Sequence, residues 1–245
     1  MRYLALSDIH ANIDALDAVL AAAHTGGFDH VLCLGDIVGY GADPNGVIDR
    51  IRLAAPVAFV RGNHDRVGAG LDDAEGFNPV AREGAIWTQR SLTAENREYL
   101  TRLVAGPVLV DDLIEICHGS PFDEDAYVFD ALDALNALRA ARRPLCLFGH
   151  THAPAAVTLS RDELRDESTE AGSVLRIREH TRYLVNVGSV GQPRDGDPRA
   201  GFGIVDTERR EVRFYRVAYP VERAQARIRE AGLPDALAER LAVGR

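Results

Sequence analysis

Five short segments of the sequence concentrate aspartate, asparagine and histidine side chains, most of them beside a glycine. These segments are Asp8-Ile9-His10, Gly35-Asp36, Gly62-Asn63-His64-Asp65, His118-Gly119 and Gly149-His150-Thr151-His152. Carboxylate and amide oxygens together with imidazole nitrogens, without a thiolate, suit Mn, Fe, Zn or Ni rather than a closed structural zinc site. The donors suffice for two divalent or trivalent metal ions. We predict that the metal ligands are Asp8, His10, Asp36, Asn63, His118, His150 and His152.

Such a pair of cations would perform phosphoryl chemistry. Two metals roughly 3.5–4 Å apart acidify a bridging water, and the resulting hydroxide attacks while the metals clamp the phosphoryl oxygens. We expect His64 to act differently, because it adjoins Asn63 but pairs naturally with Asp65. A histidine held by a carboxylate is better suited to be an acid than a ligand. We predict that His64, held by Asp65, protonates the departing alkoxide.

Each of these polar segments follows an apolar run that reads as a buried strand. The runs are 3–6, 31–34, 57–60, 113–116 and 145–148. In an open α/β sheet, ligands gather at the carboxyl ends of the strands. The five segments should therefore meet in one pocket. The Pro/Asp-rich stretch 119–143 lies between two of them and is a candidate wall or lid.

The chain changes character after His152. Strands and helices alternate over the first 150 residues, as in a mainly parallel sheet with covering helices. Strands joined by turns follow, with 161–172 expected as an exposed hairpin loop. Two short helices, 220–231 and 234–242, close the chain. The pattern predicts an α/β protein in which two sheets pack face to face, and the 245 residues are most simply one domain.

The composition excludes several classes of protein. A net charge of −9 argues against long nucleic acid and anionic membranes as partners. No apolar run approaches the roughly 18 residues of a membrane span. Three cysteines, two of them inside predicted strands, make a full disulfide framework impossible and indicate a cytoplasmic location. The chain lacks both a Gly-x-Ser-x-Gly elbow and a His-Glu-x-x-His zinc-peptidase motif.

The polar segments, read in order, resemble the motifs of the calcineurin-like metallophosphoesterase superfamily. The resemblance spans about residues 1–155 and implies a four-layer α/β/β/α sandwich of two mixed sheets with a dinuclear site at the carboxyl ends of the strands. It also implies how the ligands divide. One metal would take Asp8, His10, Asp36 and His152, and the other would take Asp36, Asn63, His118 and His150.

Two arginines are candidates for binding substrate. Arg61 makes the segment Arg-Gly-Asn-His, which is similar to the phosphoprotein phosphatase and diadenosine tetraphosphatase branch, so it is expected either to contact phosphate or to form a surface ion pair. Ala11 departs from that branch, which usually has glycine there. The segment 186–189 resembles a loop near the site in the bacterial phosphodiesterase branch, and Arg194 could follow it into the pocket or belong to a structural loop.

The leading hypothesis is a metal-dependent phosphoesterase acting on a small phosphodiester or phosphomonoester. A phosphoprotein or dinucleoside polyphosphate phosphatase is an alternative within the same chemistry. A different class is a non-catalytic scaffold that uses this fold to bind a protein partner, but such relatives typically lose ligands and every expected position is filled here. The apolar residues of the terminal helices fit either a homodimer contact or core packing.

Overall fold

Two mixed six-stranded sheets form the centre of the protein in a computed structural model that describes residues 1–245. The first sheet has the order β3 (Ala58–Phe59), β2 (His30–Cys33), β1 (Arg2–Leu6), β11 (Ala200–Asp206), β12 (Glu211–Val217) and β9 (Val174–Arg176). The second has the order β4 (Val108–Leu109), β5 (Ile114–Ile116), β6 (Leu145–Phe148), β10 (Arg182–Asn186), β7 (Ala155–Ser160) and β8 (Glu163–Asp166).

Eight helices accompany the sheets. They are α1 (Ile13–Gly26), α2 (Pro44–Ala54), α3 (Asn63–Gly68), α4 (Pro79–Ser91), α5 (Ala94–Thr101), α6 (Ala131–Ala140), α7 (Val221–Glu230) and α8 (Asp235–Val243). Local capping fixes where the helices after β1 and β2 begin. The Asn12 side chain accepts from the backbone N–H of Ala15, and Asp43 accepts from that of Gly46.

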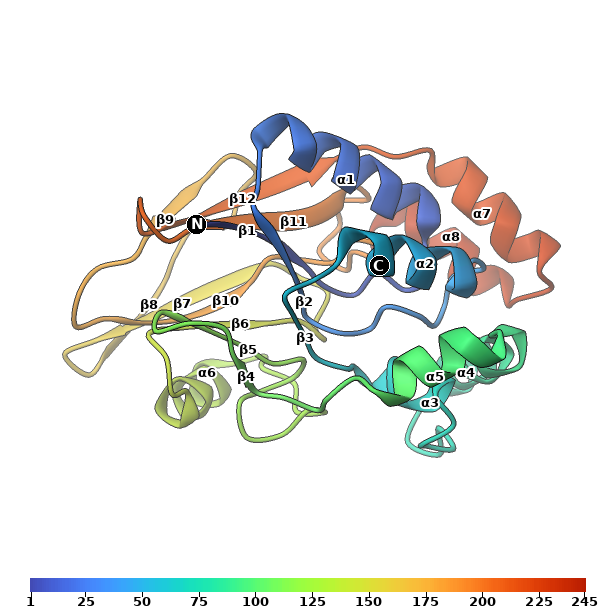
Figure 1. The fold of residues 1–245 in the computed structure, drawn as a ribbon, viewed down its shortest axis with the longest axis horizontal. Helices are drawn as coiled ribbons and strands as arrows, with labels where there is room; N and C mark the ends of the chain where they lie inside the picture. The colour runs from blue at the N-terminus through green and yellow to red at the C-terminus, as the bar shows by residue number, and fades with distance from the viewer.

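Strand alternation divides the buried side chains into layers. In β1, Leu4 and Leu6 face the helices, whereas Tyr3 and Ala5 face the second sheet. In β6, Leu145 and Leu147 fill the space between the sheets, and the residues between and after them pack against α6. Figure 1 shows α1 along the outer face of the first sheet, α7 and α8 beyond the ends of its strands at the right, and α6 beneath the second sheet. The four-layer α/β/β/α sandwich is confirmed.

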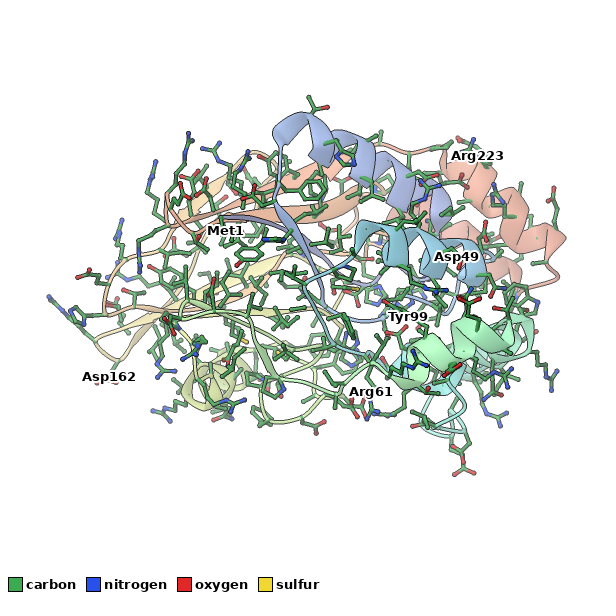
Figure 2. The ribbon with its side chains drawn as sticks, viewed as in Figure 1. Met1, Asp49, Arg61, Tyr99, Asp162 and Arg223 are labelled. Carbon is green, nitrogen blue, oxygen red and sulfur yellow. The ribbon has the colours of Figure 1, made fainter.

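The structure corrects two details of the sequence analysis. The expected loop 161–172 contains a strand, because β8 pairs with β7 in an antiparallel hairpin whose tip carries Asp162 (Figure 2). Each sheet also takes strands from both halves of the chain, since β1 lies between β2 and β11 and β6 lies between β5 and β10.

None of the helices is both long and apolar enough to cross a lipid bilayer.

The terminal helices pack their apolar residues against each other, and α7 also packs against α1. Ile228 of α7 and Leu237 and Leu241 of α8 are buried in the same core cluster as α1 and β1. Core packing therefore accounts for these residues, and a homodimer stays a prediction.

Candidate metal centre

The loops that follow five strands converge at one edge of the sandwich. The loop after β1 carries Asp8 and His10, the loop after β2 carries Asp36, and α3 begins at Asn63 directly after β3. From the second sheet, His118 follows β5, and the loop after β6 supplies the remaining two histidines. The structure thus brings together all seven predicted ligands. Asn63 is partly buried and the other six are buried.

The ligand atoms form two groups that share one aspartate. The first group is Asp8, His10, Asp36 and His152, and the second includes Asp36, His118 and His150. Within each group the donor atoms lie within 4.8 Å of one another. Asp36 Oδ2 is 3.4 Å from His10 Nε2 and 3.4 Å from His118 Nε2. One carboxylate oxygen therefore stands between the groups, as a bridging ligand would.

In each ligand group, two histidine rings place one nitrogen against a backbone carbonyl and the other nitrogen against the neighbouring ring. In the first group, His10 Nδ1 is 3.0 Å from the Val38 carbonyl oxygen and His152 Nδ1 is 2.7 Å from that of Gln192. If these nitrogens donate, both Nε2 atoms carry lone pairs, and the two are only 3.0 Å apart. A cation between them resolves that repulsion. Backbone carbonyls are the usual partners that orient metal-bound histidines.

The second group repeats this arrangement. His118 Nδ1 lies 2.8 Å from the Leu34 carbonyl oxygen, and His150 Nε2 lies 3.1 Å from that of Asp125. The facing nitrogens, His118 Nε2 and His150 Nδ1, are 3.1 Å apart. Neighbouring ligands about 2.1 Å from one cation would be separated by roughly 3.0–3.4 Å. Both groups therefore fit a metal ion.

Two buried oxygens of the site have no hydrogen-bond partner. They are Asp8 Oδ2 and Asn63 Oδ1. An unsatisfied buried polar atom costs about 1–3 kcal/mol. These two oxygens are therefore suited to bind a cation. Burial raises the pKa of Asp8 to about 6. Burial would also raise the pKa of Asp36, but the surrounding histidines, His118 foremost and then His64 and His10, together outweigh burial and hold that pKa well below its ordinary value.

The backbone is strained at the ligands. Asp8, His10, Asp36, His150 and His152 all have φ between 49° and 66°. Residues with a Cβ adopt this left-handed conformation at a cost of roughly 1–2 kcal/mol each. Five of the thirteen non-glycine residues with a positive φ are therefore predicted ligands.

Two glycines allow the close packing of the centre. A Cβ atom at Gly62 would overlap Asp36 Oδ1. Gly39 has a φ of 93°, and a Cβ there would overlap the ring of His64. Glycine lets the backbone approach both side chains.

A cavity of about 470 Å³ opens onto the metal centre. Asp36, Asn63, His150 and His152 line it, together with His64 and Arg194. The sequence analysis missed other lining residues: Tyr40, Arg66, Asp72, Phe77, Asn78, Asp125 and Tyr127.

The segment between His118 and β6 forms a wall of this cavity, as expected. The Tyr127 ring stacks on His150 with centroids 3.9 Å apart, and the ring of Phe129 stacks on Tyr127 at 4.8 Å. Aromatic residues within an otherwise Pro/Asp-rich loop were the signal that could have identified Tyr127 in the sequence.

His64 lies in the cavity wall, but the prediction that Asp65 holds its ring is wrong. Its ring packs among Tyr40, Phe77 and His10 at centroid distances of 4.3, 4.7 and 4.9 Å, and its Nδ1 has no hydrogen-bond partner. Asp65 instead accepts from the backbone N–H groups of Val38 and Gly62, at 3.1 and 3.0 Å. As the third residue of α3, Asp65 binds the backbone N–H of the N-cap residue Gly62 instead of the ring.

This geometry predicts that Asp65 supports the loops rather than the chemistry. Asp65→Ala should lower the free energy of unfolding by about 2–4 kcal/mol, because two backbone N–H groups lose their acceptor. Urea denaturation would measure the change, with Asp73→Ala as an exposed control. A normally stable variant with no activity would instead favour a direct catalytic role.

The two predicted substrate arginines are in different environments. Arg61, at the end of β3 (Figure 2), donates from Nε and Nη2 to the Glu124 carboxylate at 2.9 and 2.8 Å and does not line the cavity. Arg61 therefore forms the ion pair that the sequence analysis gave as one of its two alternatives. Its contact with phosphate stays a prediction. Arg66 meets the same Glu124 and does line the cavity. Arg194 also lines it, and its buried Nε has no partner.

The segment 186–189 and Ala11, the other positions that the sequence analysis singled out, lie outside the cavity lining. Ser189 Oγ donates to the Asp8 carbonyl oxygen at 2.8 Å, and Asn186 Nδ2 donates to that of Gly149 at 2.9 Å. The 186–189 loop thus supports two ligand loops. Ala11 adopts a φ of 50° without lining the cavity, so its methyl group does not restrict the cavity.

Comparison with known proteins agrees with this site. Residues 1–210 match the calcineurin-like phosphoesterase superfamily domain, and the chain belongs to this superfamily, which is metal-dependent. A metallophosphoesterase from Sphaerobacter thermophilus is 41% identical, with a TM-score of 0.88 over 100% of this chain and 99% of that one. An uncharacterised protein of Methanocaldococcus jannaschii is 33% identical, covering 98% of this chain and 97% of the relative. A hypothetical protein from Pyrococcus horikoshii shares the fold, with 22% identity and a TM-score of 0.81 over 100% of this chain and 98% of that one.

Proposed function

We propose that this protein is a dinuclear metal-dependent hydrolase of a small phosphodiester or phosphomonoester. The observation that carries the proposal is the pair of buried ligand groups sharing Asp36 at the floor of an open cavity. Family membership supports phosphoester chemistry. The cavity volume, and the wall formed by the segment with Tyr127, favour a small substrate over a folded phosphoprotein.

The bound metals would supply an acidified water as nucleophile and would polarise the phosphoryl oxygens. The chain itself would position the ester. Arg194 lines the cavity together with His152, and its Nη2 donates only to two neutral groups, the Tyr40 hydroxyl and the Gln192 side-chain oxygen, at 3.3 and 3.0 Å. A guanidinium group binds phosphoryl oxygens well, because its donors match their geometry.

His64 would give its proton to the leaving oxygen. Burial lowers the pKa of His64 to about 4, so the ring is neutral at pH 7 in the free protein. An anionic substrate beside the ring would raise that pKa and promote protonation. The role of His64 as an acid therefore depends on a bound phosphoester.

The direct test combines metal analysis of purified protein with a panel of phosphoesters. Diesters, monoesters, cyclic nucleotides, dinucleoside polyphosphates and phosphopeptides would each be assayed with Mn, Fe, Zn and Ni. We expect about two metal ions per chain, with hydrolysis of small esters that is lost after chelation and restored by metal. Metal binding without hydrolysis of any ester would favour the scaffold alternative.

Arg194 and Arg61 provide a matched pair of variants. Arg194→Ala should lower kcat/KM about 10- to 100-fold, the effect of losing hydrogen bonds from a charged donor to phosphate. Arg61→Ala should change it less than about threefold, because Glu124 already occupies that side chain. Steady-state kinetics on one small ester would compare the two, and the reverse ranking would assign the phosphate contact to Arg61.

A further inference from the structure

A second polar hollow lies at the opposite ends of the strands from the metal centre. Its volume is about 490 Å³, and its lining includes five arginines and, apart from Pro144, only polar or charged residues. It adjoins Pro144, just before β6, whereas the metal ligands follow the other end of that strand. The arginines are Arg142, Arg143, Arg178, Arg182 and Arg210.

Most of this positive charge is unpaired. Arg143 is 3.7 Å from the exposed Asp112, but the other four guanidinium groups form no ion pair with any carboxylate of the chain. The hollow also contains Glu179 and His180. An excess of unpaired cations is unusual in a chain of net charge −9, where carboxylates outnumber arginines. The hollow is thus a local positive region on an acidic protein.

Backbone carbonyls hold three of these arginines in place. Arg182 Nη1 donates to the carbonyl oxygens of Leu138 and Ala141 at 3.0 and 2.6 Å. Arg143 Nε donates to a carbonyl oxygen at 2.7 Å, and Arg210 Nε does so at 3.3 Å. A carbonyl orients a guanidinium group without cancelling its charge and leaves further N–H donors free. These arginines are therefore preorganised for an anion.

We propose that this hollow binds a small polyanion carrying two or more adjacent phosphate groups. Several guanidinium groups around one hollow match clustered phosphoryl oxygens, to which arginine donates pairs of hydrogen bonds. The negative charge of the whole protein opposes a long nucleic acid. The site is separate from the metal centre, so the proposal does not depend on the proposed hydrolysis.

Calorimetric titration with tripolyphosphate would test the proposal. The full-length protein would be titrated as isolated and again after treatment with EDTA, because the hollow needs no metal. We expect one probe molecule per chain after EDTA treatment, with affinity that falls as salt concentration rises, and additional binding at the metal centre before that treatment. Absence of binding at millimolar probe, or binding that disappears with EDTA, would overturn the proposal.

A charge-matched pair of variants locates the binding. Arg178→Gln/Arg210→Gln changes two exposed side chains of the hollow, and Arg82→Gln/Arg90→Gln makes the same charge change on α4. We expect about a tenfold or greater loss of affinity in the first and less than a twofold loss in the second. Thermal unfolding would verify that both remain folded.

Three outcomes of this comparison count against the proposal. Equal losses in both variants would show only non-specific attraction. Unchanged affinity in the hollow variant would place the probe elsewhere. A single-stranded oligonucleotide that binds more tightly than tripolyphosphate, and depends on the same arginines, would replace the small polyanion with nucleic acid.

Discussion

Asp36→Ala should leave a folded protein that retains neither its metal ions nor its activity. Asp36 Oδ2 stands between the two ligand groups, so its removal takes an anionic ligand from both. Loss of a group that merely orients a ligand usually costs about 10–100-fold in metal affinity or activity, and loss of a shared ligand should exceed that. Metal analysis after gel filtration, together with an ester assay, would measure the effect.

Asp73→Ala is the control for this substitution, because it removes an exposed carboxylate outside the site. Circular dichroism would establish that the Asp36 variant is folded. If that variant kept two tightly bound metals per chain, the dinuclear arrangement proposed here would be wrong.

His64→Ala should lower kcat about 10²- to 10⁴-fold while the metals stay bound, which is the usual contribution of a positioned acid. The loss should be largest for alkyl esters and smallest for nitrophenyl esters, because a good leaving group needs no proton. This dependence on the leaving group separates proton donation from a structural effect. Kinetics with a series of esters and metal analysis of the same samples would measure both.

His64→Gln serves as the companion variant, since a longer side chain fills more of the space between Tyr40 and Phe77. Both variants should show the same trend across leaving groups. An equal loss for every ester, or full activity in either variant, would contradict the assigned role.

The ligands were predictable because each directly follows a strand. An apolar run that ends in Asp, Asn or His determines both the burial of the strand and the place of the polar side chain. Asp8 and Asp36, for example, follow β1 and β2, which are parallel neighbours in one sheet. Convergence of the five segments required that parallel strands expose the same end within each sheet and that the two sheets stack with those ends together.

Contacts made through tertiary structure were not predictable in this way. Asp65 is next to His64 in sequence, but at the start of a helix adjacent side chains point apart, and the backbone N–H of Gly62 competes for the carboxylate. Arg61 meets Glu124 across 63 positions of the chain. The arginines of the second hollow likewise come from three separate segments, 142–144, 178–182 and Arg210, so no single local pattern marks the site.

Each sheet contains strands from both halves of the chain, and this affects when during synthesis the metal centre can form. All seven donor residues precede Ala153, yet the loop of Asp8 is fastened by Ser189 and Gly191, and β1 needs β11 as its flanking strand. On the ribosome the donors emerge long before these late partners. We therefore expect metal loading to await nearly complete synthesis, because a nascent chain stalled before Ser189 would hold every predicted donor without the contacts that fasten the Asp8 loop.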